Sequence, residues 1–100
     1  MKIEHIAVAS RSENDSDKFF MELLDFNKER IFMVSSDLME KFFGLKKEQK
    51  VIRYRNNDIK VEVFITNDDS RTKDHFTHSC LFVKNRNELV EKASLMGFNV

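Results

Sequence analysis

The chain has 100 residues, of which 34% are charged and 41% hydrophobic, and its 17 basic and 17 acidic residues cancel. The balanced charge gives no bulk attraction to nucleic acid or to an anionic membrane. No apolar run approaches the roughly 20 residues that a membrane span needs. A single cysteine, Cys80, excludes an intramolecular disulfide framework and is typical of a reducing compartment. We therefore expect one soluble, cytoplasmic domain that binds neither nucleic acid nor membrane.

The first part of the chain is predicted to form a strand followed by a helix. Residues 2–9 are apolar on both faces of a period-two pattern, which is typical of a strand covered on both sides. Residues 10–17 are polar and supply possible helix N-caps, among them Ser12. A helical stripe of apolar residues then follows, made by Phe19, Phe20, Leu23 and Leu24.

The middle of the chain is predicted to be mostly strand. Residues 28–35 contain a short apolar run, and residues 36–43 resemble a capped helical turn stopped by Gly44. Strands over 51–55 and 59–66 are joined by an Asn-Asn-Asp turn, which predicts a hairpin. The alternation between apolar and polar residues is clearest in the second of these strands.

A second strand and helix are predicted after a polar loop over residues 67–74. Residues 76–83 alternate as a strand does, and Asn85 followed by a glutamate three residues later resembles a capping box. Gly97 is expected to end the helix, and residues 98–100 read as the start of a further strand. In this reading Cys80 is a small buried filler of the second strand.

The two parts resemble each other in order and in length. His5 to Phe26 spans 21 positions and His78 to Phe98 spans 20, and each begins with a histidine on a predicted strand and ends after an amphipathic helix. A strand and helix repeated in this way indicate a duplicated module.

Three residues occupy strand positions where apolar side chains are the usual occupants: His5, Glu62 and His78. Glu62 lies in the middle of Ile-Lys-Val-Glu-Val-Phe-Ile and is explained either by a solvated sheet face, helped by Lys60, or by a role as metal ligand or general base. Histidines are often partly buried without binding anything. The spacing of the three residues alone leaves both interpretations open.

The order of these motifs resembles the vicinal oxygen chelate superfamily, which includes glyoxalase I, extradiol dioxygenases and bleomycin resistance proteins. The resemblance is carried by the His-Ile-Ala-Val strand, the helix ending in Leu-Leu-Asp-Phe, the Val-Glu-Val-Phe strand, and the second histidine strand with its helix ending in Met-Gly-Phe. It implies an α+β fold in which βαβββ modules form a curved mixed sheet, with helices on the outer face and an open cup around a divalent metal. The first module would cover 1–66 and a partial second module 75–100, within one domain.

The resemblance also implies the residues of a site. His5, Glu62 and His78 match the positions of metal ligands, and Glu62 would also act in catalysis. Two imidazoles and a carboxylate suit Zn, Fe, Mn, Co or Ni. The chain ends as the sixth strand begins, so a fourth ligand that the family often carries has no counterpart here. The phenylalanines expected to line the cup and contact the substrate are Phe64, Phe76 and Phe82.

Three functions follow as alternatives. The first is a metal-dependent isomerase, lyase or dioxygenase acting on a small oxygen-bearing substrate. The second is a metal-free module of the same fold that binds or sequesters a small molecule, and the third is a degenerate structural domain. An unpaired sheet edge would also favour a homodimer. Arg53 and Arg55, on one strand face, are expected to be exposed on the outer face unless they contact an anionic substrate, and His75 is expected to be solvated.

Overall fold

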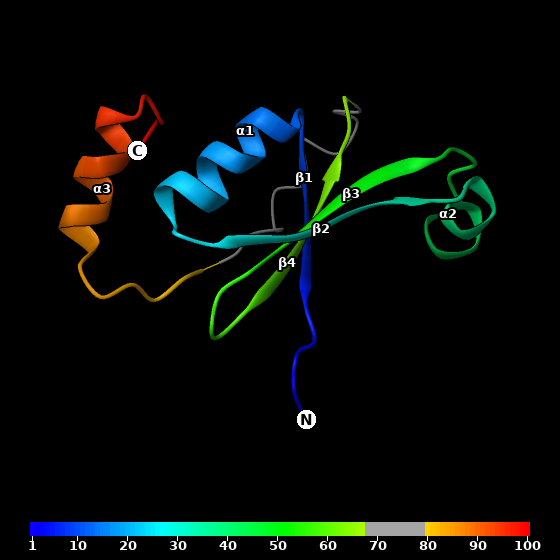
Figure 1. Ribbon diagram of the computed structural model, residues 1–100, viewed down its shortest axis with the longest axis horizontal. Helices are drawn as coiled ribbons and strands as arrows, with labels where there is room; N and C mark the ends of the chain where they lie inside the picture. Colours follow the sequence, from blue (N-terminus) through cyan, green and yellow to red (C-terminus); the bar gives the residue numbers. More distant parts are fainter. Residues whose placement is uncertain (68–79) are drawn as a thin grey trace. The chain divides into compact units, whose positions relative to one another are not determined.

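The computed structural model describes residues 1–67 and 80–100 (Figure 1). The chain divides into two compact units, Met1–Asn67 and Asp68–Val100, and each is described by itself. In the parts described, no helix is long and apolar enough to cross a membrane. The elements in chain order are β1 (Ile6–Ser10), α1 (Glu13–Asp17), η1 (Lys18–Leu23), β2 (Asn27–Val34), α2 (Ser36–Phe43), β3 (Gln49–Arg55) and β4 (Lys60–Ile65), and in the second unit α3 (Arg86–Leu95).

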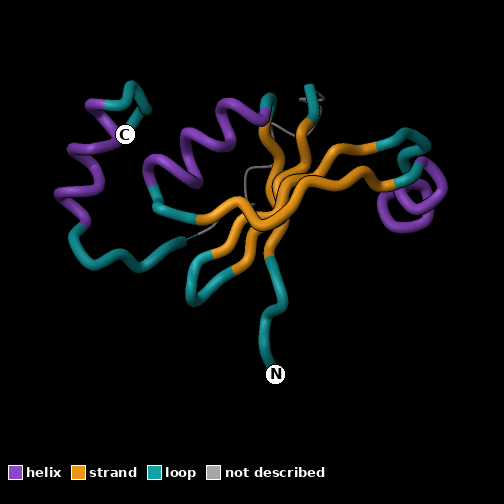
Figure 2. Tube along the Cα trace, viewed as in Figure 1, coloured by secondary structure: helices purple, strands orange, loops and turns teal. Residues whose placement is uncertain are grey.

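The first unit is built on a four-stranded mixed sheet of order β1-β4-β3-β2. Strand β1 pairs in parallel with β4, and the other two pairings are antiparallel. Figure 2 shows the four strands crossing the middle of this unit. The chain order of strand, helix and three strands confirms the predicted βαβββ arrangement, with α2 inserted between β2 and β3.

Strand β1 is shorter at its beginning than the sequence predicted. Residues 1–5 precede it and are exposed, whereas the prediction placed the strand over 2–9. Its partner β4 begins at Lys60, one residue before the first pair, Ile6 with Val61. Since an extended segment is stabilised by the ladder that it joins, β1 starts where β4 can pair with it.

The helix after β1 begins as the sequence predicted and then widens. The Ser12 hydroxyl accepts a hydrogen bond from the backbone N–H of Asp15 at 3.0 Å and caps α1. The π-helical turn η1 continues it, and the N–H of Leu24 donates to the carbonyl of Phe19 at 3.2 Å. Asp25 follows with a φ of 60°, a left-handed conformation that Asp tolerates better than most residues.

The core of the first unit lies between this helical segment and one face of the sheet. The ring of Phe20 stacks on that of Tyr54 with centroids 5.1 Å apart, and Tyr54 is fully buried. Aromatic packing of this kind stabilises the contact beyond the burial of its area. The buried residues of this cluster are Phe20, Phe26, Ile52, Tyr54, Val61 and Val63.

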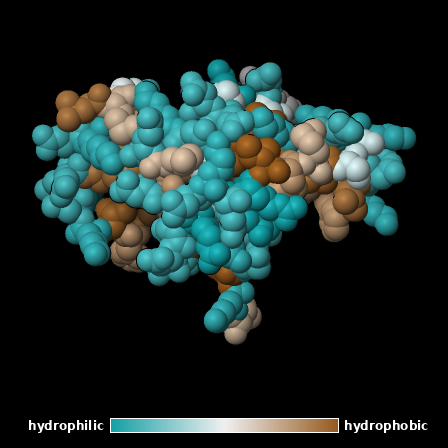
Figure 3. All heavy atoms as spheres, in the orientation of Figure 1, coloured by the Kyte–Doolittle hydropathy of each residue, from teal (hydrophilic) through white to brown (hydrophobic). Residues whose placement is uncertain are grey.

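Helix α2 is capped at both ends. The Ser35 hydroxyl accepts a hydrogen bond from the N–H of Leu38 at 3.3 Å, so the cap lies one residue before the predicted Ser-Asp pair. Gly44 ends the helix at a φ of 71°, as predicted. The ring of Phe43 contacts that of Phe64 on β4, with centroids 5.5 Å apart. Phe42 is 72% exposed, and Figure 3 shows apolar side chains gathered over this helix, at the right of the view.

The hairpin between β3 and β4 is confirmed. The side-chain carbonyl of Asn56 accepts hydrogen bonds from the N–H groups of Asp58 and Ile59, at 2.9 and 2.8 Å. This local turn fixes the register, in which Arg55 pairs with Lys60.

The helix of the second unit is also confirmed. The side chain of Asn85 accepts a hydrogen bond from the N–H of Glu88 at 3.1 Å. At the other end Gly97 adopts a φ of 88°, and the N–H of Phe98 donates to the carbonyl of Ala93 at 3.0 Å. These are the bonds of a Schellman cap, so the predicted cap residues act at both ends of α3.

Two predicted strands of the second unit are wrong in their described parts. Residues 80–83 form no strand, and residues 98–100 form none either. Cys80 is exposed, not a buried filler. The rest of the predicted strand, residues 76–79, and the loop residues from 68 onward lie outside the described residues.

Candidate functional site

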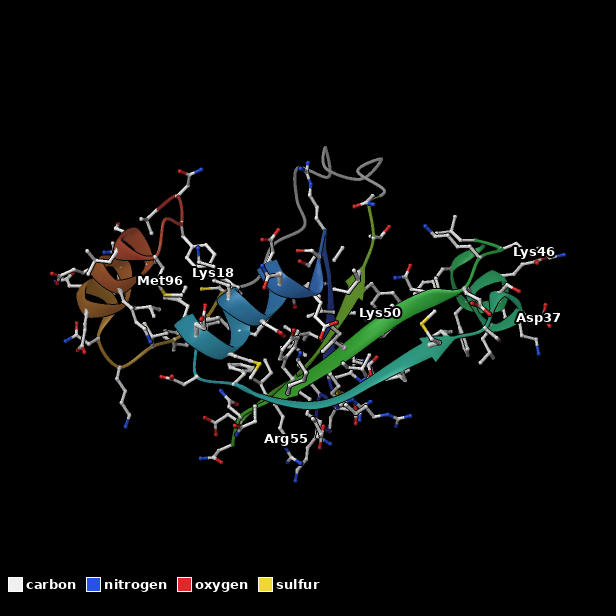
Figure 4. All side chains as sticks on the ribbon, turned by 45° about the horizontal axis from the view of Figure 1, so that its top comes forward. Lys18, Asp37, Lys46, Lys50, Arg55 and Met96 are labelled. Atoms are coloured by element: carbon white, nitrogen blue, oxygen red, sulfur yellow. The ribbon has the colours of Figure 1, made fainter. Side chains whose placement is uncertain are left out.

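The sheet of the first unit has two chemically different faces. One face packs against α1 and η1 and holds the apolar core. Figure 4 shows Lys50 on the side of α1 and Arg55 on the opposite side of the sheet. Neighbouring residues of a strand point to opposite faces, and paired residues share a face. The face with Arg55 is therefore the one that carries the candidate site residues.

Rows of paired residues cross this face from strand to strand. We name the first the central row; it consists of Ala7, Glu62, Arg53 and Arg30, on β1, β4, β3 and β2 in turn. The next row, the apolar row, consists of Ala9, Phe64, Val51 and Phe32. The face thus changes from charged to apolar over two residues along β2, β3 and β4.

Glu62 lies in the central row and is bound to Arg53 on the next strand. Its side chain is only 12% exposed. Its Oε2 accepts hydrogen bonds from Nε of Arg53 at 3.1 Å and from Nη2 at 2.5 Å. The hydrogen bond with Glu62 raises the pKa of the Arg53 guanidinium above its ordinary value. A nearly covered carboxylate is thus compensated by a charged partner.

His5 lies immediately before β1 and between two carboxylates. Its Nε2 is 3.3 Å from Oε1 of Glu62, and its Nδ1 contacts the carboxylate of Glu4. The bond to His5 is the main cause that lowers the pKa of Glu4, which also lies 3.4 Å from Nζ of Lys60. Glu4 therefore orients the ring so that Nε2 is turned toward Glu62.

The separation of these two atoms fits a pair of metal ligands. Imidazole nitrogens and carboxylate oxygens bind zinc at about 2.0–2.2 Å, so two ligands of one tetrahedral ion lie roughly 3.3–3.6 Å apart. When Nδ1 of His5 donates to Glu4, Nε2 carries a lone pair that faces an oxygen of Glu62. These two electron-rich atoms repel each other, and a cation or a proton between them removes that repulsion. No group of three His, Cys, Asp or Glu side chains that could hold a metal occurs among residues 1–67 and 80–100.

The remaining predicted site residues are placed differently. His78, Phe76 and His75 lie outside the described residues, so the third ligand stays a prediction. Phe64 is half-buried in the apolar row, next to the central row that holds Glu62. Phe82, in the second unit, is fully exposed.

The prediction for one arginine is wrong, and two residues of the site were missed. Arg53 was expected to be exposed, but its side chain is 21% exposed and bound to Glu62, whereas Arg55 is half exposed beside Glu29, as expected for a surface arginine. Glu4 and Arg30 were not predicted. The hairpin register could have placed Arg53 opposite Glu62, since both positions are counted from the turn.

The arrangement of elements is similar to that of solved structures. A glyoxalase family protein from Bacillus cereus matches with a TM-score of 0.68 at 19% identity, over 97% of this chain and 72% of that one. The protein SMU.1112c matches with a TM-score of 0.59 at 14% identity, over 97% of this chain and 75% of that one. No protein-family model matches the sequence, and no curated protein matches it significantly.

These similarities concern the fold. The chain has a glyoxalase-like fold, as the sequence resemblance implied. The α+β class with a mixed open sheet is confirmed.

Proposed function

We propose that this glyoxalase-like domain binds a divalent metal through His5, Glu62 and His78 and acts on a small oxygen-bearing substrate. The observation that carries the proposal is the 3.3 Å separation between Nε2 of His5 and Oε1 of Glu62, on the sheet face opposite the helix-packed core. Zn, Fe, Mn, Co and Ni all accept such a donor set. His78 enters the proposal from the family resemblance.

Each residue has a definite task in this proposal. A divalent ion bound there would act as a Lewis acid on a substrate carbonyl or on neighbouring oxygens. Arg53 occupies Oε2 of Glu62, which leaves Oε1 to bind or to take a proton. Glu4 holds Nδ1 of His5 and presents Nε2, the usual role of a carboxylate behind a ligating histidine.

The apolar residues would form the wall against which the substrate rests. Phe64 is two residues from Glu62 on the same strand face, and its ring contacts that of Phe43. Phe76 and Phe82 are proposed as further lining by the family resemblance. The reaction would be an isomerase, lyase or dioxygenase reaction.

The test is the metal content of the full chain after incubation with zinc and extensive dialysis. We expect close to one ion per chain, measured by elemental analysis. His5→Ala, Glu62→Gln and His78→Ala should each weaken binding at least tenfold, since each removes a direct ligand of a three-ligand site. Glu48→Gln removes an exposed carboxylate outside the strands and serves as the matched control.

Two results would contradict the proposal. One is a parent protein that retains no zinc, nor any of the other four metals when each is offered separately. The other is a metal content that is unchanged in both His5→Ala and Glu62→Gln, which would place the ion elsewhere.

A metal-free binding module is the second candidate, and a specific contact favours it. Arg53 already balances the charge of Glu62, so the carboxylate is stable without an ion. On this alternative the same face binds a small molecule through its apolar row. We also propose a homodimer, because β1 and β2 each have one edge without a partner among the described strands. Light scattering of the same samples measures the oligomeric state.

A further inference from the structure

Strand β2 forms one edge of the sheet, and its outer side pairs with no strand among residues 1–67 and 80–100. A shift of register between Lys28 and Arg30 marks a bulge, so the regular part of this edge runs over residues 30–34. Proteins usually protect an open edge with charges, proline or a covering segment, because it can pair with another chain. The chain has no proline, and residues 30–34 contain a single charge, that of Arg30.

The side chains along residues 30–34 are mostly apolar. Ile31 and Met33 are 49% and 58% exposed, and Ile31 pairs with Ile52 of the core, so both lie on the face that packs against α1. On the other face the guanidinium carbon of Arg30 lies 4.6 Å from the centroid of the Phe32 ring. The regular part of the edge therefore combines unpaired backbone groups with exposed apolar side chains.

Two copies of β2 can pair about a two-fold axis only in certain registers. Opposite residues of an antiparallel pair share a face of the sheet, so one residue must face its own copy at the axis. An axis at Arg30 would place two like charges opposite each other. An axis at Ile31 would bring the bulge into the ladder, and an axis at Met33 would leave Arg30 and Ile31 outside the paired strands. An axis at Phe32 pairs all of residues 30–34 and leaves the bulge outside.

In the register centred on Phe32, exposed apolar side chains meet each other. Ile31 lies opposite the partner's Met33, and the symmetric pair completes a cluster of four apolar side chains on the face of α1. On the other face Phe32 meets the partner's Phe32, and Arg30 lies opposite the partner's Val34. No like charges are opposed, so the edge is complementary to itself in charge as well as in apolar pattern.

We propose that two copies of this chain associate through the β2 edge, with residues 30–34 paired antiparallel about a two-fold axis at Phe32. The inference rests on the proposed function, because it names the edge and the register of the homodimer proposed there. The exposed side chains of the other edge, β1, are Ala7 and Ala9, which would bury less apolar surface. A ladder of five residues covers less than the roughly 800 Å² per partner of a standard interface, so we expect a dissociation constant in the micromolar range or above.

The first test is analytical ultracentrifugation of the full chain at concentrations from about 5 to 500 µM, which bracket that range. We expect the fraction of dimer to rise with concentration. Met33→Lys should weaken dimerisation about tenfold or more, because the new charge would lie opposite the partner's Ile31. Met21→Lys, the same change at an exposed methionine of η1, should have no effect, and neither should Ala9→Lys on β1.

The second test measures the register and does not depend on the lysine variants. It uses Cys80→Ser as the background, so that the introduced cysteine is the only one. Position 32 and its copy would be about 4.5–5.5 Å apart between Cα atoms, within reach of a disulfide, whereas position 34 and its copy would be offset by about 13 Å along the strands. Mild oxidation should therefore link Phe32→Cys into a covalent dimer and leave Val34→Cys unlinked.

Three results would overturn the inference. Dimerisation that Met33→Lys leaves unchanged, or that Ala9→Lys abolishes, would keep the homodimer but place it at another surface. Equal cross-linking at positions 32 and 34 would refute the register. A chain that stays monomeric over the whole concentration range would refute both this inference and the homodimer. Zinc content measured on the same samples tests the metal site independently of all three.

Discussion

Arg53 and Glu62 lie opposite each other on β3 and β4, and the guanidinium donates two hydrogen bonds to a single carboxylate oxygen, Oε2. The other oxygen, Oε1, is thereby left to face His5 at 3.3 Å. The two oxygens of Glu62 thus have separate partners. This division explains how a nearly covered carboxylate can be stable and yet keep one atom available for chemistry.

Removing the guanidinium should destabilise the domain. We expect Arg53→Ala to lower the free energy of unfolding by about 1–3 kcal/mol, because the carboxylate of Glu62 stays nearly covered without its partner. The measurement is chemical denaturation at neutral pH. The control is Arg55→Ala, whose half-exposed ion pair with Glu29 should contribute no more than about 0.5 kcal/mol. Equal losses in the two variants would show that the covered pair has no special weight.

Local patterns predicted the elements of the first unit because each depends on nearby residues. The cap at Ser12, the stop at Gly44 and the hairpin turn at Asn56 all act within a few residues of the chain. The parallel pairing of β1 with β4 joins residues more than 50 positions apart, and it was not predicted: the family resemblance implied a mixed sheet without saying which strands pair.

The failures have a different cause. Residues 80–83 are an apolar run of the kind that strands contain, but such a run supplies no partner, and a strand forms only where a ladder can be joined. The neighbours of His5 could not be predicted either, because Glu4 and Glu62 approach it from different segments. The sequence could identify His5 and Glu62 as candidates, but not the ion pairs that orient them.

Glu13 should make the stability of the domain depend on acid pH. Hydrogen bonds from Lys28 and Lys50, each at 2.7 Å, lower the pKa of Glu13 to about 2. A carboxyl whose pKa is lower in the folded state contributes stability above its unfolded pKa and loses it as pH falls. The loss should occur between pH 4.5 and about 2. Allowing for solvent screening, we expect about 1–2 kcal/mol.

The variant Glu13→Gln tests this contribution by denaturation at a series of pH values. It should be less stable than the parent at neutral pH, and the difference should shrink as pH falls below 4.5. Glu22→Gln, on the exposed side of the same helical segment, is the matched control. A constant difference between Glu13→Gln and the parent at every pH would refute the electrostatic explanation.

Gly44 should resist substitution because of its backbone alone. Its φ of 71° is left-handed, and a Cβ added there would meet no atom within 4 Å. Gly44→Ala should therefore cost about 1 kcal/mol from backbone strain without a steric clash. Gly44→Asn should cost less, since Asn tolerates this conformation better than Ala does. Thermal unfolding measures the stability of both variants, and the control is Lys46→Ala, two residues further along (Figure 4). If the Ala and Asn variants at position 44 were as stable as this control, the strain argument would be contradicted.

Tyr54 is the only tyrosine of the chain, and there is no tryptophan, so its ionisation can be followed by ultraviolet absorbance without interference. Burial, together with the hydrogen bond that its hydroxyl donates to Asp17 at 2.6 Å, raises its pKa to about 12. A phenol whose pKa is higher in the folded state contributes stability below its unfolded pKa of about 10, and that stability is lost as pH rises toward 12. We expect the absorbance of the folded protein to show no phenolate near pH 10, whereas the protein in denaturant should titrate there.

Tyr54→Phe should lower the free energy of unfolding at neutral pH by about 1–2 kcal/mol, because the carboxylate of Asp17 loses a donor but keeps Lys28 at 2.8 Å. Phenolate formation near pH 10 in both samples would show that the ring is not held as the structure places it.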